Sequence, residues 1–125
     1  MPAENTALKE LLCAHPLFSL VDEEKLRLLS AGSELFTLEE GNALYSAGTP
    51  AEAAFLIAVG KIVLADPENP EGNRTIPGGE LVGEECLDGV EYFTNDAHAL
   101  TDCALWRLPA DLAREALFSS PRALR

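Results

Sequence analysis

The sequence holds 125 residues, which is the usual length of one domain with a single hydrophobic core. Its nine Lys and Arg stand against twenty-one Asp and Glu, and a formal net charge of −12 at pH 7 disfavours nucleic acid and anionic lipid as partners. With 47% hydrophobic residues the chain is too apolar to remain disordered, and its nine Gly and eight Pro predict many short elements.

Cysteine usage and the N-terminus bear on the compartment. Cys13, Cys86 and Cys103 include no CxxC pair, which argues against a disulfide framework or a structural zinc site and fits a reducing environment. The acidic segment 1–5 precedes no apolar stretch of signal-peptide length, and no run approaches the ~20 residues that a membrane-spanning helix needs. We therefore expect a soluble, cytoplasmic protein.

Two short helices are predicted in the first quarter of the chain. Apolar residues recur at helical spacing over 7–12, and Pro16 predicts that this helix ends near His15. Asp22 is a candidate N-cap for the second helix, because two glutamates follow in its first turn. Gly32 marks the end of this second helix.

From Glu34 to Leu108, short apolar runs alternate with turn residues, which is the pattern of strands of roughly 4 to 8 residues. The predicted strands are Glu34–Leu38, 43–46, Ala53–Val59, 62–65, 93–100 and 104–108. The run 55–59 is apolar on both faces, and Gly60-Lys61 predicts a tight hairpin turn between the third and fourth strands. The polar segment 66–73 contains two Pro and is predicted to be an exposed hairpin tip instead of a strand.

A last helix follows the strands. Pro109 suits its first position, and Leu112 and Ala116 belong to one apolar face before Ser119-Ser120-Pro121 stops it. A strand series must hide its edges by closing into a barrel or a double sheet. We therefore expect one mainly β domain over 1–125, in which helices at 1–32 and 109–125 flank a jelly-roll-like β-roll, a double-stranded β-helix, at 33–108.

Several motifs follow one another in a characteristic order: Glu40-Gly41, Leu44, Gly48, the run 55–62 and Gly79-Glu80-Leu81-Val82-Gly83-Glu84. Together they resemble the cyclic nucleotide-binding domain, the β-roll sensor of catabolite activator proteins, protein kinase A regulatory subunits and nucleotide-gated channels. The resemblance covers roughly residues 17–121. It implies a non-enzymatic regulatory or sensor module with cAMP or cGMP as its ligand.

The resemblance places the ligand over the turn Gly83-Glu84-Glu85-Cys86-Leu87, which corresponds to the phosphate-binding cassette of the family. From the residues alone, this segment is also able to open a helical turn whose free N–H groups face a ligand. By position, Glu84 matches the acid that accepts the ribose 2′-hydroxyl. The N–H groups of Glu85 and Cys86 match those that face the cyclic phosphate.

The arginine that pairs with the phosphate in the family is absent. Phe93 stands at its position, and Thr94 occupies the neighbouring Ser/Thr/Ala position. The segment 75–106 has no Lys or Arg and carries the acids Glu80, Glu84, Glu85, Asp88, Glu91, Asp96 and Asp102. A charged hydrogen bond is worth ~1.5 to 3 kcal/mol, so the loss of a bidentate arginine predicts roughly ten- to a thousandfold weaker phosphate binding.

Other residues provide alternatives. Arg74 or Arg107 is able to reach the pocket from a neighbouring strand, and His98 is able to add positive charge when protonated. Cys86, His98 and Cys103 have the chemistry of a zinc site, but free cysteines commonly serve as small core residues, and we expect no metal. The serines lie outside any nucleophile-elbow motif, and we expect neither a catalytic residue nor a cofactor.

Two functions remain open from the sequence. In the first, the domain binds cAMP or cGMP weakly, or another small polar ligand, over the 83–87 turn and passes the change to its terminal helices. In the second, it is a ligand-free protein-interaction or dimerisation domain whose pocket is filled by Phe93. The candidate protein partners are a second copy of the chain and an output domain, either covalently linked or separate.

Overall fold

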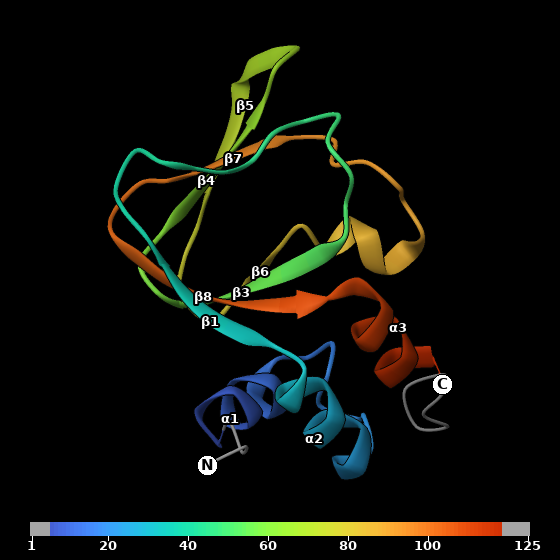
Figure 1. The fold of residues 1–125 in the computed structure, drawn as a ribbon. Helices are drawn as coiled ribbons and strands as arrows, with labels where there is room; N and C mark the ends of the chain where they lie inside the picture. The colour runs from blue at the N-terminus through green and yellow to red at the C-terminus, as the bar shows by residue number, and fades with distance from the viewer. Residues whose placement is uncertain (1–5, 119–125) are drawn as a thin grey trace.

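The structure is a computed structural model that describes residues 6–118. Two antiparallel sheets of four strands face each other, and the helices gather at one end of the molecule, beneath the first sheet (Figure 1). The mainly β architecture with flanking helices agrees with the prediction from the sequence.

Consecutive strands mostly lie in different sheets, as in a jelly roll. The first sheet has the order β1-β8-β3-β6, with β1 at Glu34–Leu38, β8 at Cys103–Pro109, β3 at Ala53–Val59 and β6 at Leu81–Val82. The second has the order β2-β7-β4-β5, with β2 at Ala43–Tyr45, β7 at Asp96–Ala99, β4 at Ile62–Asp66 and β5 at Asn69–Ile76. Every strand pair in these sheets is antiparallel.

The first sheet separates two hydrophobic cores. Along β3, Ala54 and Leu56 face the helices, whereas Phe55 and Ile57 face the second sheet. This alternation follows from the two-residue period of a strand and explains why the run 55–59 is apolar on both faces. The core under the helices also contains Leu8, Leu12, Phe18, Leu26, Leu29, Cys86, Leu87, Trp106, Leu108, Ala113 and Leu117.

The three helices lie where the sequence predicts them. They are α1 at Thr6–Ala14, α2 at Glu23–Ala31 and α3 at Ala110–Phe118. Asp22 occupies the N-cap position of α2. Pro109 still belongs to β8, so α3 begins one residue later than predicted, and the predicted stop at 119–121 lies outside the described residues. Within residues 6–118, no helix has the length and apolar character needed to cross a bilayer.

The predicted hairpin at Gly60-Lys61 is wrong. β3 pairs with β8 and β6, whereas β4 pairs with β5 and β7, so the chain passes from one sheet to the other at this point. Gly60 has φ +99°, and a Cβ there would lie 2.5 Å from the carbonyl oxygen of Asp102. The glycine was recognised as a turn residue, but the sequence does not reveal which strands it joins.

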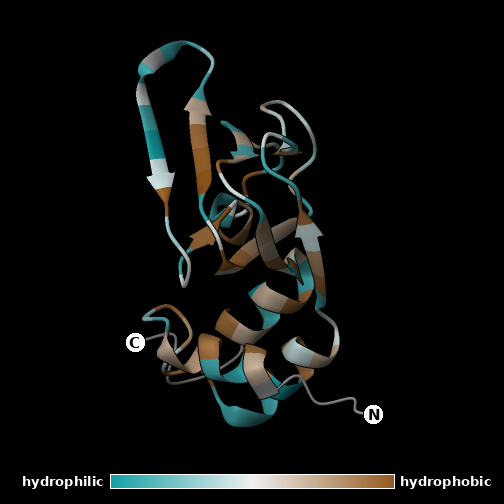
Figure 2. Cartoon of the chain, turned by 90° about the vertical axis from the view of Figure 1, so that its left-hand side faces the viewer, coloured by the Kyte–Doolittle hydropathy of each residue, from teal (hydrophilic) through white to brown (hydrophobic). Residues whose placement is uncertain are grey.

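The prediction that 66–73 forms no strand is also wrong for most of the segment. Only Pro67-Glu68 forms the turn, and β5 then pairs with β4 along its length. β5 is an edge strand of a hairpin that extends beyond the body of the roll, and its side chains are largely hydrophilic (Figure 2). An edge strand in solvent needs no apolar alternation, so the periodicity that identifies buried strands is missing.

The remaining strand limits differ by smaller amounts. β2 ends one residue earlier than predicted, and β4 and β8 are slightly longer. The predicted strand 93–100 begins only at Asp96 in the structure, so Phe93 and Thr94 lie in the preceding loop. The two-residue strand β6, which leads directly into the candidate site, is not predicted from the sequence.

Candidate functional site

The predicted turn forms a short 3₁₀-helix, η1, at Glu84–Asp88, directly after β6. Gly83 precedes it with φ +73°, a conformation that favours glycine. Cys86 and Leu87 are buried in the core under the helices and thereby fix η1 to the body of the molecule. Glu84 is exposed to solvent and Glu85 is half-buried.

Phe93 lies against Gly83, so the structure brings together two residues that the sequence analysis assigned to the candidate site. A Cβ on Gly83 would lie 3.0 Å from the Cε1 atom of Phe93. The Phe93 ring is 6% exposed and stacks on Tyr45, with centroids 3.8 Å apart and an interplanar angle of 11°. The backbone of Phe93 also exchanges hydrogen bonds with Gly48 and Thr49. The ring is therefore a fixed part of the roll.

Thr94 holds the loop against η1. Its backbone N–H and its hydroxyl both donate to the Oε2 atom of Glu85, at 3.2 and 3.1 Å. The Glu85 carboxylate is thus engaged in a structural contact. Within residues 6–118, Glu84 has no hydrogen bond or ion pair through its carboxylate.

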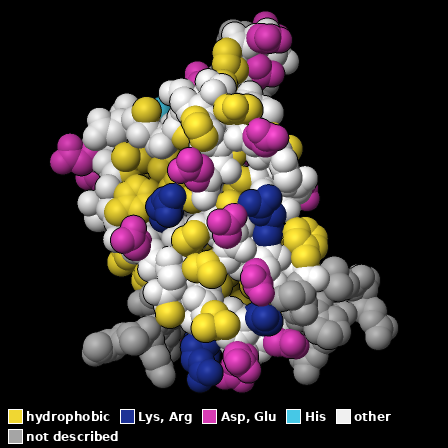
Figure 3. Space-filling model, turned by 45° about the vertical axis from the view of Figure 1, so that its right-hand side comes forward, with side chains coloured by type: hydrophobic (Ala, Val, Ile, Leu, Met, Phe, Trp, Pro, Cys, Tyr) yellow, Lys and Arg dark blue, Asp and Glu magenta, His cyan; other side chains and the backbone are white. Residues whose placement is uncertain are grey.

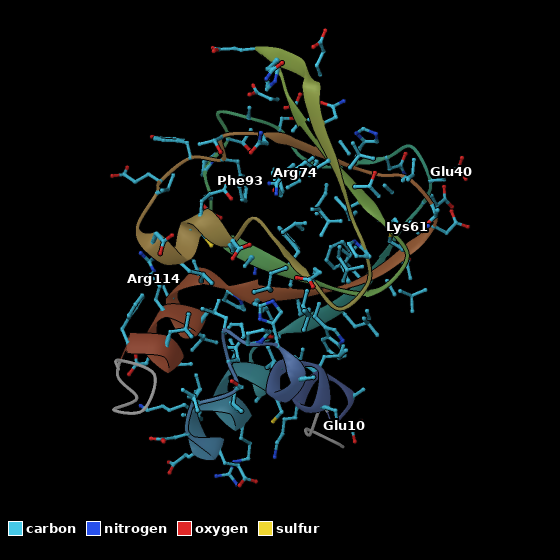
Figure 4. The ribbon with its side chains drawn as sticks, turned by 180° about the vertical axis from the view of Figure 1, so that it is seen from behind. Glu10, Glu40, Lys61, Arg74, Phe93 and Arg114 are labelled. Atoms are coloured by element: carbon cyan, nitrogen blue, oxygen red, sulfur yellow. The ribbon has the colours of Figure 1, made fainter. Side chains whose placement is uncertain are left out.

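A cavity of about 350 Å³ opens beside η1. Its walls come from β4, β5, β6 and η1, and the polar or charged side chains that line it are Arg74, Glu80, Glu84, Glu85 and Asn95. Apolar side chains of Leu64, Ile76, Leu81 and Val82 line the rest. Figure 4 shows Arg74 and Phe93 at the end of the roll that holds η1. The cavity joins ligand-sized volume with a small number of polar groups, which is typical of a small-molecule site.

The sequence alone does not decide whether Arg74 or Arg107 reaches the candidate site. Arg74 is the one Lys or Arg side chain in the cavity lining within the described part of the chain. Arg107, the other candidate, lines a separate groove of about 420 Å³ together with Tyr45, Phe55 and Phe93. The pairing of β5 with β4 places Arg74 beside this cavity. The sequence does not predict that pairing, so it does not distinguish Arg74 from Arg107.

Two buried groups near the site have perturbed acidity. Burial, followed by the negative charge of Glu85, raises the pKa of the Tyr45 phenol well above its usual range. Burial raises the pKa of the Cys86 thiol to about 11, although the nearby Arg114 opposes the shift. Both groups are protonated at neutral pH, and a thiol in that state is a poor nucleophile and metal ligand.

The sulfur and imidazole groups considered as metal ligands do not gather. Cys86 lies in the core under the helices and Cys103 in the core inside the roll. The Sγ atom of Cys103 donates to the carbonyl oxygens of Thr101 and Lys61, at 3.1 and 3.3 Å. In the part of the chain that the structure describes, no cluster of three or more His, Cys, Asp or Glu side chains is arranged to hold a metal ion.

The face in Figure 3 intersperses acidic side chains with a few Lys and Arg side chains and apolar ones. Two of the described ion pairs join different helices: Lys9 of α1 lies 3.4 Å from Glu23 of α2, and Lys25 of α2 lies 3.8 Å from Glu115 of α3. The surface therefore follows the acidic composition of the whole chain.

Residues 35–120 match the family model of the cyclic nucleotide-binding domain. The chain belongs to this family. It is a regulatory or sensor domain of the cyclic nucleotide-binding type, and its β-roll confirms the fold that the resemblance implied. A comparison with curated proteins gives no match.

Solved structures share the fold at low sequence identity. The sensor domain of the transcriptional regulator DNR from Pseudomonas aeruginosa superposes with a TM-score of 0.83 and 23% identity, over 95% of this chain and 83% of that one. The regulatory subunit of a cAMP-independent protein kinase A from Trypanosoma brucei gives 0.74 and 19%, over 84% and 38%. The regulatory domain of Toxoplasma gondii protein kinase A, crystallised with cAMP, gives 0.78 and 19%, over 89% and 43%.

Proposed function

We propose that the chain is a non-enzymatic sensor module that binds a small polar ligand in the cavity beside η1. In this proposal, cAMP and cGMP bind more weakly than to a domain that has the phosphate-pairing arginine. The observation that carries the proposal is the combination of an open cavity of about 350 Å³ with a phenylalanine ring packed on Gly83. Phe93 fills the position of the arginine but leaves the cavity beside it open.

The residues around the cavity support ligand binding of this kind. Glu84 lines the cavity with a carboxylate that is free to accept a hydrogen bond from a ligand hydroxyl. Glu85, Thr94 and Phe93 instead hold the loop and η1 in place. We therefore assign ligand contact to Gly83 and Glu84, with Cys86 and Leu87 as anchors of the turn.

The same arrangement gives the sensor an output. Cys86 and Leu87 of η1 pack in one core with Ala113 and Leu117 of α3. A ligand that displaces η1 changes this packing, because a close-packed core transmits small shifts. We infer that α3 is the element that communicates binding to an output domain or to a second copy of the chain.

The superposed structures differ in their use of cAMP, so they do not decide which nucleotide this chain binds. One of the three superposed structures contains cAMP, whereas another is described as cAMP-independent. The same β-roll therefore serves proteins that differ in their use of cAMP. Because this fold does not fix the ligand, the residues of the cavity must decide it.

The second candidate function is a ligand-free interaction domain, and the tight packing of Phe93 favours it. Calorimetric titration with cAMP and cGMP distinguishes the two functions when wild type is compared with Phe93→Arg. The expected result is weak binding by wild type and binding roughly tenfold or more tighter in the variant, since a new charged hydrogen bond adds ~1.5 to 3 kcal/mol.

Tyr92→Arg is the matched control, because Tyr92 is the adjacent residue and is 54% exposed. It adds the same charge to the same loop without replacing the ring on Gly83, and its affinity should stay near that of wild type. Thermal unfolding of each variant verifies that it is folded. Micromolar binding by wild type would contradict the proposed weakness, and binding only in Phe93→Arg would favour the ligand-free function.

A further inference from the structure

We propose that Arg74 holds the anionic group of the ligand, and that the ligand is a small organic molecule with one anionic group and additional hydroxyl or ammonium donors. The inference rests on the proposed function, since it concerns the same cavity. It assigns the cationic role to a residue of β5, outside the segment 75–106 that lacks Lys and Arg.

The strand register directs Arg74 toward the cavity. Arg74 lies opposite Leu64 in the antiparallel pair of β5 and β4. Directly opposed residues place their side chains on the same face of a sheet. Leu64 is buried in the core inside the roll, so its face is the one turned toward the first sheet. Arg74 therefore projects to the inner side of the second sheet, where both residues line the cavity.

Arg74 is exposed to solvent, so its guanidinium is accessible to a ligand. Within residues 6–118, Arg74 has no carboxylate within ion-pair distance, which is also true of Arg107, but only Arg74 of the two lines this cavity. The arginine also makes no side-chain hydrogen bond within the described chain. An unpaired guanidinium beside a cavity is a donor for a planar anionic group such as a carboxylate or phosphate.

The carboxylates of the cavity limit the charge of the ligand. Three glutamates, Glu80, Glu84 and Glu85, line it together with the single arginine, so its lining is net negative. Glu85 is engaged by Thr94, whereas Glu84 is free to accept from a ligand donor. A group with two or more negative charges would be repelled. A ligand with one anionic group at Arg74 and hydroxyl or ammonium donors toward Glu84 matches the charges on both sides of the cavity.

The test compares Arg74→Gln with Arg107→Gln in the full chain by ¹⁵N-resolved NMR titration. The probes are cAMP, which has a singly charged phosphodiester and a hydroxyl, and dimethyl phosphate, the minimal singly charged phosphodiester. We expect Arg74→Gln to weaken cAMP binding by roughly ten- to a hundredfold, as for a lost charged hydrogen bond. Arg107→Gln should bind like wild type, because Arg107 does not line this cavity, whereas Phe93 adjoins the cavity through its contact with Gly83.

The outcomes separate this inference from the proposed function. If wild type binds cAMP and Arg74→Gln binds it equally well, the role of Arg74 is refuted and the sensor proposal stands. If cAMP does not bind but dimethyl phosphate shifts the amides of 83–85 in wild type and not in Arg74→Gln, Arg74 is an anion-binding group and nucleotide sensing fails. If neither probe shifts these amides, both proposals are refuted.

Discussion

At the scale of single residues, the site depends on the contact between Gly83 and Phe93. The glycine has a positive φ, and its missing side chain leaves room for the phenylalanine ring that stacks on Tyr45. The sequence alone identified both positions through the family motif. It did not identify Tyr45, because the residue that stacks on Phe93 comes from a strand in the distant segment 43–45.

Gly83→Ala tests this contact, with Gly89→Ala as its matched control. Both glycines have positive φ, +73° and +88°, but a Cβ on Gly89 meets nothing within 4 Å. The left-handed conformation alone costs an alanine about 1 to 2 kcal/mol. The collision with Phe93 should add roughly 1 to 3 kcal/mol to the loss in Gly83→Ala. Urea unfolding measures both, and equal losses would show that the ring does not crowd Gly83.

At the scale of elements, the sequence predicted the helices and the buried strands better than the edge of the second sheet. β3 has the predicted limits because its apolar run is mostly buried, and β1 has them because Phe36 and Leu38 pack on the core inside the roll. β5 was missed because its solvent-exposed side chains have no apolar period, and with it the inward direction of Arg74 was missed. The strands that flank Gly60 pair with strands distant in the sequence, and local sequence patterns do not encode such pairing.

The packing of η1 on the helices predicts a pH dependence through Cys86. Its thiol has an ordinary pKa of 9.0 and a pKa of about 11 in the folded chain, so the unfolded state loses this proton first. Stability should therefore fall as pH rises from about 9 to about 11, by a total on the order of 2 to 3 kcal/mol. Ionisation of Tyr45 in the unfolded state adds to the loss above its ordinary pKa of 10.0.

Urea unfolding under reducing conditions, from about pH 8 to about pH 10.5, measures this effect in wild type and Cys86→Ala. Removal of the thiol should make the decline between about pH 9 and pH 10 shallower, by up to ~1 kcal/mol per pH unit. Cys13 is exposed and is present in both proteins, so its titration cancels in the comparison. Parallel curves would show that the Cys86 thiol does not resist ionisation in the folded chain.

At the scale of the whole molecule, the helices contact the site from two directions. Cys86 and Leu87 of η1 share a core with α3. On the other side, the Nε2 atom of His15, just after α1, lies 3.9 Å from a carboxylate oxygen of Glu80, which also lines the cavity. The ligand that we propose between Arg74 and Glu84 would therefore lie near groups that contact α3 and the segment just after α1.

The acidic character of the molecule works against any anionic ligand, and this sets the affinity we expect. The net charge is −12, and a single arginine opposes three glutamates at the cavity. The structure places no second Lys or Arg of residues 6–118 in this lining. In our proposal, a cyclic phosphodiester contacts Arg74 and lacks the pairing that an arginine at position 93 would supply.

The affinity of the wild-type chain for cAMP tests this account most directly. Isothermal titration at physiological ionic strength should give a dissociation constant in the millimolar range, with tighter binding in Phe93→Arg and weaker binding in Arg74→Gln. A micromolar constant for wild type that Arg74→Gln leaves unchanged would contradict the account, because the nucleotide would then be held by groups other than those of this cavity.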